Sequence, residues 1–261
     1  MNRLAGKRIL VTGASRGLGR QLALDFAREG TETLVLTARH RPHLEVVRAE
    51  ILKIAPAAQV VIIDADVSRP EDVERTVATA LNAFEGRLDV LVNNASTIGP
   101  APMPYLLDYP FEDFQAVLNT NLVGPFQMIR NALPAMAERG GSIINVTSDA
   151  GVVGYAGWGA YGISKFGLEG MSQTWAAELA ETQVRVNWVD PGSMNTAMHR
   201  AAEPEEDPNR WADPAEVTEV FIFLASDESK GVTGRRFQAQ EDWKLQLLTP
   251  AADCCGWGPN A

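Results

Sequence analysis

The chain has 261 residues, of which 46% are hydrophobic, and its formal net charge at pH 7 is −10. This composition can bury a full core, and the acidic balance argues against nucleic acid or an anionic membrane as the main partner. No apolar run of about 18 residues is present and the amino terminus lacks the apolar core of a signal peptide, so we expect a cytoplasmic protein without a membrane partner.

The first predicted element is a strand over residues 7–12, followed by a glycine-rich turn at 13–19 and an amphipathic helix at 20–29. The turn has the spacing Gly-x-x-x-Gly-x-Gly. A strand, a glycine turn and a helix in this order place the phosphates of a nucleotide at the helix N-terminus, where glycine lets the backbone approach them. The alternative is a plain tight turn.

The second predicted strand, residues 33–38, ends beside Arg39 and has no acidic residue at its end. An acid at this point would bind a ribose 2′-hydroxyl, whereas guanidinium groups suit a 2′-phosphate. Arg16 in the glycine turn supplies a second guanidinium. The pair predicts NADP(H) as the cofactor, the alternative being an Arg39 that points into solvent.

Further strands and helices alternate along the chain, which predicts βαβ units and a doubly wound parallel α/β sheet. We expect one domain over residues 1–240 and a C-terminal tail over 241–261, which contains the adjacent Cys254 and Cys255 as reduced thiols. The remaining predicted strands are 59–63, 88–92, 141–147, 183–189 and 234–240, and the remaining helices are 44–54, 70–84, 111–139, one around 161–165, and 213–225.

The helical pattern at 111–139 is interrupted at Gly124-Pro125 and at Pro134. A proline cannot donate a hydrogen bond to the carbonyl four residues back, which for Pro125 belongs to Asn121. We expect that carbonyl to be free to accept a hydrogen bond from water, the alternative being a kink without a chemical role.

Tyr161 and Lys165 are four residues apart, so on a helix they share one face. A phenol with a pKa of about 10 is a poor proton donor at neutral pH, and a neighbouring ammonium is expected to lower that pKa. Ser148 follows a predicted strand at its carboxyl end, where α/β proteins place their chemistry. The three residues predict a proton-transfer site, although a surface lysine beside a half-buried tyrosine is the alternative.

Taken together, these motifs resemble the single-domain short-chain dehydrogenase/reductases over roughly residues 6–240. The motifs are TGASRGLG at 12–19, Asp66-Val67, NNAS at 93–96, NLVGPF at 121–126, the triplet Ser148, Tyr161 and Lys165, and Pro191-Gly192 with Thr196. The resemblance implies a Rossmann fold of three αβα layers, no metal, and a homodimer or homotetramer.

The resemblance also implies an NADP-dependent enzyme acting on CH–OH groups. Tyr161 would be the general acid, Lys165 would lower its pKa, Ser148 would polarise the substrate oxygen, and Asn121 would anchor a water molecule. The implied cofactor-binding residues are Gly13, Ser15, Arg16, Gly17, Leu18, Gly19, Arg39, Asp66, Val67, Asn94, Ala95, Tyr161, Lys165, Pro191, Gly192 and Thr196.

Three features depart from the family pattern. Ser96 replaces a glycine, which is expected to cost about 1 kcal/mol if the site needs a positive φ. The sequence at 240–243 replaces the usual Asp-Gly-Gly. In the family this end of the chain often packs across a subunit interface, so a tetramer is less certain than a dimer. The polar segment 193–211 has no clear period, and its acidic residues at 203–207 would disfavour anionic substrates if the segment forms a lid.

The substrate is expected to be a small neutral ketone, aldehyde or alcohol, because the candidate pocket residues are apolar or aromatic. One alternative is a 3-oxoacyl-thioester reductase, against which stands the absence of Lys and Arg between Lys165 and Arg185. Another is a non-catalytic NADP-binding sensor, which would not need the triplet. The candidate pocket residues are Val153, Tyr155, Trp158, Met194, Met198 and His199.

Overall fold

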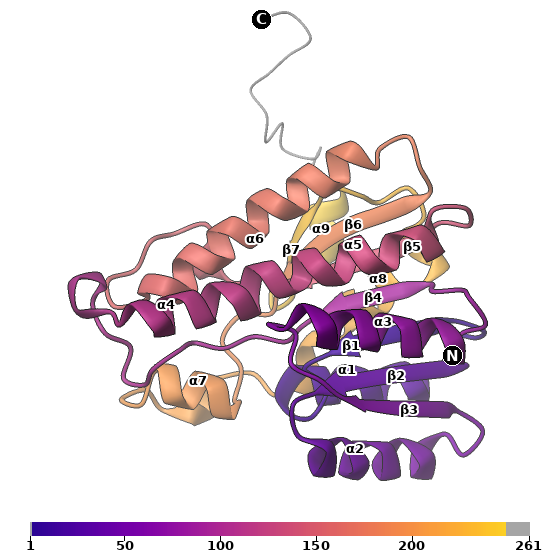
Figure 1. Ribbon diagram of the computed structural model, residues 1–261, viewed down its shortest axis with the longest axis horizontal. Helices are drawn as coiled ribbons and strands as arrows, with labels where there is room; N and C mark the ends of the chain where they lie inside the picture. Colours follow the sequence, from indigo (N-terminus) through magenta and orange to yellow (C-terminus); the bar gives the residue numbers. More distant parts are fainter. Residues whose placement is uncertain (1, 249–261) are drawn as a thin grey trace, which may run out of the picture.

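The computed structural model describes residues 2–248. Within this range one parallel sheet has the strand order β3-β2-β1-β4-β5-β6-β7 (Figure 1). Most of its strands are apolar runs, as expected for a sheet that is covered on both faces. The strands are β1 (Arg8–Thr12), β2 (Thr33–Ala38), β3 (Gln59–Asp64), β4 (Val90–Asn93), β5 (Gly141–Val146), β6 (Val184–Asp190) and β7 (Arg236–Gln238).

Helices cover both faces of the sheet. Apolar side chains of α1, α2 and α8 pack on one face and those of α3, α5 and α6 pack on the other. The three-layer, doubly wound α/β fold predicted from the sequence is therefore confirmed. The helices are α1 (Gly17–Arg28), α2 (Arg41–Ile54), α3 (Pro70–Ala83), α4 (Phe111–Leu118), α5 (Gly124–Met136), α6 (Gly159–Glu178), α7 (Ala197–Ala202), α8 (Glu219–Ala225) and α9 (Trp243–Leu248).

The strand order reverses between β1 and β4, which are neighbours in the sheet although they are not consecutive in the chain. The connections from these two strands leave toward opposite edges, and this opens a crevice at their carboxyl ends. The glycine turn after β1 and the segments after β4, β5 and β6 all begin at this crevice (Figure 1).

The predicted helix at 111–139 is divided into α4, a π turn at Asn119–Val123, and α5. In the π turn the Gly124 N–H donates to the Asn119 carbonyl five residues back, directly before Pro125. The predicted interruption at this proline is confirmed. The one predicted at Pro134 is wrong: α5 continues through Pro134, and the Ala137 N–H donates to the Leu133 carbonyl at 3.0 Å.

Two further segments differ from the prediction. The region without clear period contains α7, and the predicted helix at 213–225 is a 3₁₀ turn at Pro214–Val217 followed by α8. Beyond residue 240 the chain forms α9, where the Trp243 ring packs against Phe223 with centroids 4.9 Å apart.

Cys254 and Cys255 lie outside the described residues. Between residues 2 and 248 no helix has both the length and the apolar character needed to cross a membrane.

Candidate active site

A cleft of about 790 Å³ lies at the carboxyl ends of the central strands. It runs from the glycine turn after β1, past the ends of β4 and β5, to the segment that contains α7. Every catalytic and cofactor-binding residue predicted from the sequence lines this cleft except Asn121, which is buried. The tertiary structure therefore brings together motifs that are up to 183 residues apart, since the first lies at Gly13 and the last at Thr196 (196 − 13).

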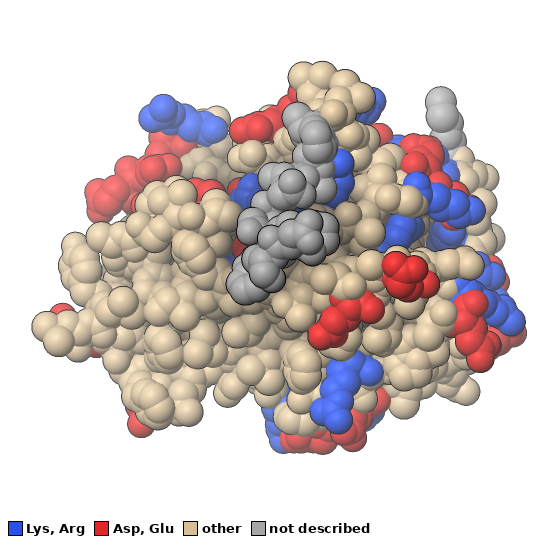
Figure 2. All heavy atoms as spheres, turned by 90° about the horizontal axis from the view of Figure 1, so that it is seen from above, with Lys and Arg blue, Asp and Glu red and all other residues tan. Residues whose placement is uncertain are grey.

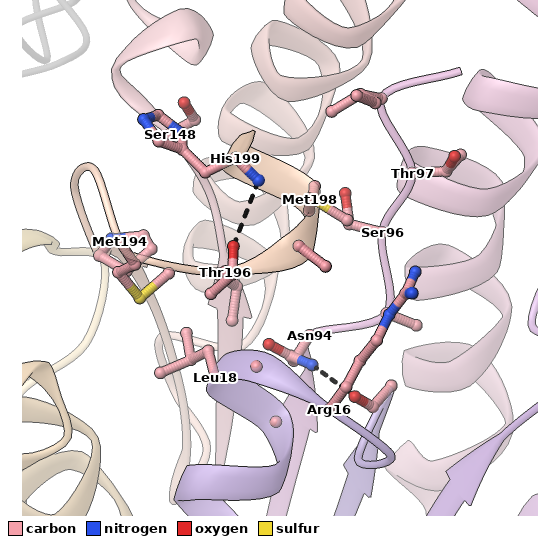
Figure 3. Close-up of a pocket in the computed structure, with 18 of the residues that line it drawn as sticks. Arg16, Leu18, Asn94, Ser96, Thr97, Ser148, Met194, Thr196, Met198 and His199 are labelled. Carbon is pink, nitrogen blue, oxygen red and sulfur yellow. Dashed lines mark hydrogen bonds between the residues drawn. The ribbon is translucent and has the colours of Figure 1, made fainter. Parts of the chain in front are cut away.

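The glycine turn packs directly against the end of β4. Gly13 has φ +66°, and a Cβ atom on it would lie 2.8 Å from the Ala95 Cα. The Asn94 side-chain amide donates to the Thr12 carbonyl at 2.9 Å and also to the Gly13 carbonyl at 3.2 Å. Figure 3 shows Asn94 beside the glycine turn. A Cβ atom on Gly19 would overlap both this amide and the Gly13 carbonyl. The turn therefore has no room for side chains at these two positions.

The N-terminus of α1 opens into the cleft without a side-chain cap. Arg16 is the N-cap residue, and its side chain makes no capping hydrogen bond. Helix N-termini carry free N–H groups and a partial positive charge, and both favour an anion. A helix start that its own side chains leave uncapped, on a turn held close by glycine, fits the phosphates of a dinucleotide.

Arg16 and Arg39 are exposed and line the same end of the cleft. Neither guanidinium forms an ion pair with another residue in the range 2–248, whereas Arg41 pairs with Asp64 at 3.2 Å and with Glu45 at 3.6 Å. Two unpaired guanidinium groups next to the phosphate-binding turn suit a further phosphate.

At the other end of the cleft, Ser148, Tyr161 and Lys165 lie together. The Ser148 hydroxyl donates to the Asp149 carboxylate at 2.9 Å and accepts from the Ala150 N–H at 3.2 Å. Tyr161 is 9% exposed and Lys165 is 2% exposed, both on α6. The Lys165 Nζ donates to the Val146 carbonyl at 2.8 Å and lies 5.4 Å from the centre of the Tyr161 ring.

Burial dominates the pKa values of both α6 residues. It raises the pKa of Tyr161, an effect that the Ser148 hydroxyl opposes and that Asp190 and Asp149 reinforce. Burial lowers the pKa of Lys165 to about 8, against the carboxylates of Asp190 and Glu169. The predicted net lowering of the Tyr161 pKa is wrong, because burial of the phenol is the largest effect on this pKa and raises it. A phenol of raised pKa stays protonated at neutral pH, so it carries the proton that a general acid needs but releases it less readily than a free phenol does.

The Asn121 side chain is fully engaged inside the π turn. Its amide donates to the Thr97 carbonyl at 2.8 Å and the Ser164 hydroxyl at 3.0 Å, and its oxygen accepts from the Thr97 N–H at 2.8 Å and the Ser96 hydroxyl at 3.1 Å. Ser96 does not adopt a positive φ; among the described non-glycine residues only Glu85 does. The conformational cost considered for Ser96 therefore does not arise, and its hydroxyl adds a bond that holds Asn121.

The segment after β6 is held by a residue that the sequence patterns did not single out. The Gln240 side-chain amide donates to the carbonyls of Pro191 and Ser193 at 2.9 and 2.8 Å. Asp190 accepts from the Gly192 N–H at 2.9 Å. A glutamine therefore anchors this segment at the point where the chain lacks the Asp-Gly-Gly of the family pattern.

The short helix α7 covers the cleft near Tyr161. Thr196 caps it by accepting from the His199 N–H at 3.3 Å (Figure 3). Met198 and Ala202 on α7 pack with Trp158 against a small apolar cluster that includes Tyr161. Thr196 is a residue type that often caps a helix, and it precedes a run of helix-forming residues, so the sequence contained a signal for α7. The acidic and proline-bearing sequence that follows made the helical pattern hard to recognise.

Four of the predicted pocket residues, Trp158, Met194, Met198 and His199, line the cleft. Val153 and Tyr155 do not; both are exposed, and the Tyr155 hydroxyl donates to Asp149 at 3.0 Å. Placing these two residues in the pocket was therefore wrong. Among residues 2–248, no group of three or more His, Cys, Asp or Glu side chains could hold a metal ion.

Comparisons with known proteins agree with this geometry. A family model described as short chain dehydrogenase matches residues 7–207. The chain is 36% identical over 242 residues to a 3-oxoacyl-[acyl-carrier-protein] reductase of Thermotoga maritima, covering 89% of this chain and 96% of that protein.

Solved structures are similar over the same range. A short chain dehydrogenase from Pseudomonas syringae is 37% identical with a TM-score of 0.86, covering 92% of this chain and 96% of that one. A short chain dehydrogenase from Shigella flexneri, complexed with NADP, is 33% identical with a TM-score of 0.84, covering 92% of this chain and all of that one.

Proposed function

The chain belongs to the short-chain dehydrogenase family, and from this premise we propose that it is an NADP(H)-dependent oxidoreductase that interconverts a neutral carbonyl compound and its alcohol. The observation that carries the proposal is the buried phenol of Tyr161 beside Ser148 and Lys165, at one end of a cleft whose other end is a glycine turn that fits phosphates. This arrangement supports proton transfer next to a bound dinucleotide.

The residues of the cleft fit NADP(H). The turn at 13–19 and the uncapped start of α1 would hold the pyrophosphate, and Arg16 and Arg39 would hold the 2′-phosphate. Asp66 and Val67 would lie along the adenine, and the segment 191–196 would hold the nicotinamide amide. When bound, the nicotinamide supplies or accepts a hydride.

In the direction of reduction, Tyr161 gives its phenolic proton to the carbonyl oxygen of the substrate. Ser148 turns its hydroxyl from Asp149 to the same oxygen and stabilises the charge that develops there. Lys165 keeps a positive charge near the phenol, which favours release of its proton. The four hydrogen bonds of the Asn121 side chain hold the π turn in place. The main-chain carbonyl of Asn121 can then bind a water molecule, through which a proton returns to the site.

The substrate pocket supports a neutral and largely apolar molecule. Ile98, Trp158 and Met198 line the cleft beside Tyr161 and carry no charge. A 3-oxoacyl thioester is the second candidate, because the curated relatives include proteins named as 3-oxoacyl-[acyl-carrier-protein] reductases. The exposed side of α6 offers no Lys or Arg to an acidic carrier protein, which favours the neutral carbonyl.

The test is NADPH oxidation by the purified protein with neutral ketones and aldehydes, and with an acetoacetyl thioester as the competing substrate. We expect turnover with at least one neutral carbonyl and slower turnover of the thioester. Faster turnover of the thioester would favour the second candidate. If NADPH binds and no compound in a broad panel reacts, the proposed activity is wrong and a non-catalytic sensor is favoured.

Arg39→Asp is expected to weaken NADPH binding at least about tenfold and to leave NADH binding unchanged or stronger, because it replaces a 2′-phosphate ligand with a ribose ligand. The measurement is cofactor affinity by fluorescence titration. Arg48→Asp is the matched control: it makes the same charge change on a partly exposed residue of α2 that does not line the cleft. An unchanged ratio of NADPH to NADH affinity in Arg39→Asp would remove Arg39 from the cofactor site.

The protein is also proposed to be a cytoplasmic homodimer or homotetramer. Val123, Phe126, Ile163 and Phe166 are partly exposed apolar residues on the π turn, α5 and α6. Figure 2 shows a broad surface on this side of the molecule with few charged residues. An exposed apolar surface of this kind supports burial against a second copy of the chain.

A further inference from the structure

A cluster of buried charges lies directly behind Tyr161 and Lys165, and it belongs to none of the sequence motifs. Its first member is Glu169 on α6, which is 5% exposed. The Glu169 carboxylate accepts from the Thr147 hydroxyl at 2.7 Å and from Nε of Arg236 at 3.0 Å. Burial raises the pKa of Glu169, whereas these two bonds favour its charged form.

Arg236 connects this carboxylate to two other elements of the site. One of its terminal nitrogens donates to Asp190 at 2.9 Å and to the main-chain carbonyl of Ser148 at 3.3 Å. Asp190 is the last residue of β6 and is also 5% exposed. A single guanidinium on β7 therefore joins α6, the end of β6 and the residue whose hydroxyl faces the substrate.

Lys165 has a buried charge but no ion pair of its own among the described residues, since its ammonium donates to the Val146 carbonyl. The carboxylates that favour its charged form are Asp190 and, one turn further along α6, Glu169. With Lys165 and the partly buried Arg236 they make a group of two positive and two negative charges. Neutrality of this kind is what allows a buried ammonium to persist.

We propose that Arg236, Glu169 and Asp190 are positioning residues for the reaction: the guanidinium holds the two carboxylates where they offset the charge of Lys165, and it holds the main chain of Ser148. This inference rests on the proposed function. The charged groups around Tyr161 and Lys165 are Glu169 from α6, Asp190 from β6, Arg236 from β7, which bonds to both carboxylates, and Asp149 from the turn after β5. Removing the Glu169 charge leaves Lys165 with less compensation, so its ammonium gives up a proton at lower pH.

The test is an NMR titration of lysine labelled with carbon-13 at Cε, which follows protonation whether or not the protein is active. The chain has five lysines, and loss of a signal in Lys165→Met assigns the resonance. We expect a wild-type midpoint near pH 8. In Glu169→Gln, which keeps the size and the accepting oxygen, we expect a midpoint lower by at least about half a unit. Glu178→Gln, on an exposed residue of the same helix, is the control and should match wild type.

Steady-state kinetics then tests whether Glu169 and Arg236 affect catalysis, Arg236 through its bond to the main chain of Ser148. The rate of carbonyl reduction should fall with rising pH as Lys165 loses its proton, and Glu169→Gln should move this fall to lower pH by the same interval. Arg236→Gln should lower kcat at least about fivefold at pH 7, and Arg236→Lys should recover part of the loss because it still pairs with Asp190.

An unchanged Lys165 midpoint in Glu169→Gln overturns the proposal, as does a wild-type kcat in folded Arg236→Gln. If Arg236→Gln does not fold, the titration of Glu169→Gln decides alone. A wild-type protein that reduces no carbonyl contradicts the proposed function but leaves the titration readable, so the two failures are distinguishable.

Discussion

Tyr161→Phe is expected to lower kcat for carbonyl reduction by about 10²- to 10⁴-fold, because the variant lacks the proton that the proposed mechanism transfers to the substrate oxygen. The phenyl ring fills the same space next to Trp158, whose ring centre lies 5.5 Å from that of Tyr161, so folding should be preserved. A loss of this size corresponds to about 3–5 kcal/mol of transition-state stabilisation. NADPH oxidation with the best substrate of the panel provides the measurement.

The matched control is Tyr155→Phe. It removes a phenolic hydroxyl from an exposed residue that donates to Asp149 and does not line the cleft, so kcat should stay within about twofold of wild type. NADPH affinity should be similar in both variants. Turnover in Tyr161→Phe equal to that in Tyr155→Phe would show that the phenol is not the acid.

Gly19→Ala is expected to weaken NADPH binding at least about tenfold and to lower the free energy of unfolding by about 1–3 kcal/mol. The added methyl group would overlap the Gly13 carbonyl and the Asn94 amide, so the turn would have to move away from the end of β4. That movement displaces the N–H groups that hold the phosphates. Cofactor titration and denaturant unfolding measure the two effects.

Gly170→Ala is the control for this change, because Gly170 is also a helical glycine and a Cβ atom on it would meet nothing within 4 Å. Alanine is the better helix former, so this variant should gain about 0.5–1 kcal/mol and bind NADPH as wild type does. If Gly19→Ala behaves like Gly170→Ala, the close approach of the turn to β4 is not what the cofactor requires.

Local patterns in the sequence predicted the strands well but several side-chain environments poorly. Residues 33–38 form a buried strand because an apolar run rich in β-branched residues favours a strand that is covered on both faces. Val153 and Tyr155 illustrate the opposite case. Their apolar and aromatic character suggested a pocket, but the loop between β5 and α6 turns both side chains to the surface. Burial in a loop depends on contacts that no short-range period encodes.

For the protonation of the site, too, the sequence predicted which residues share a face but not the environment of their side chains. Spacing alone placed Tyr161 and Lys165 on one helix face, which is confirmed. It did not show that the Lys165 ammonium would reach the Val146 carbonyl, or that burial would raise the pKa of the phenol. Both depend on how α6 packs over the end of β5.

By itself, the sequence determined the alternation of strands and helices, the parallel sheet and the glycine turn, because each depends on residues within one turn of helix or one strand. Only the tertiary structure decided that Arg236 on the last strand would join Glu169 on α6 to Asp190 on β6. It also decided that α7 would cover Tyr161. Such contacts follow from the order of strands in the sheet, and that order is set by the packing of the whole core and not by any single segment.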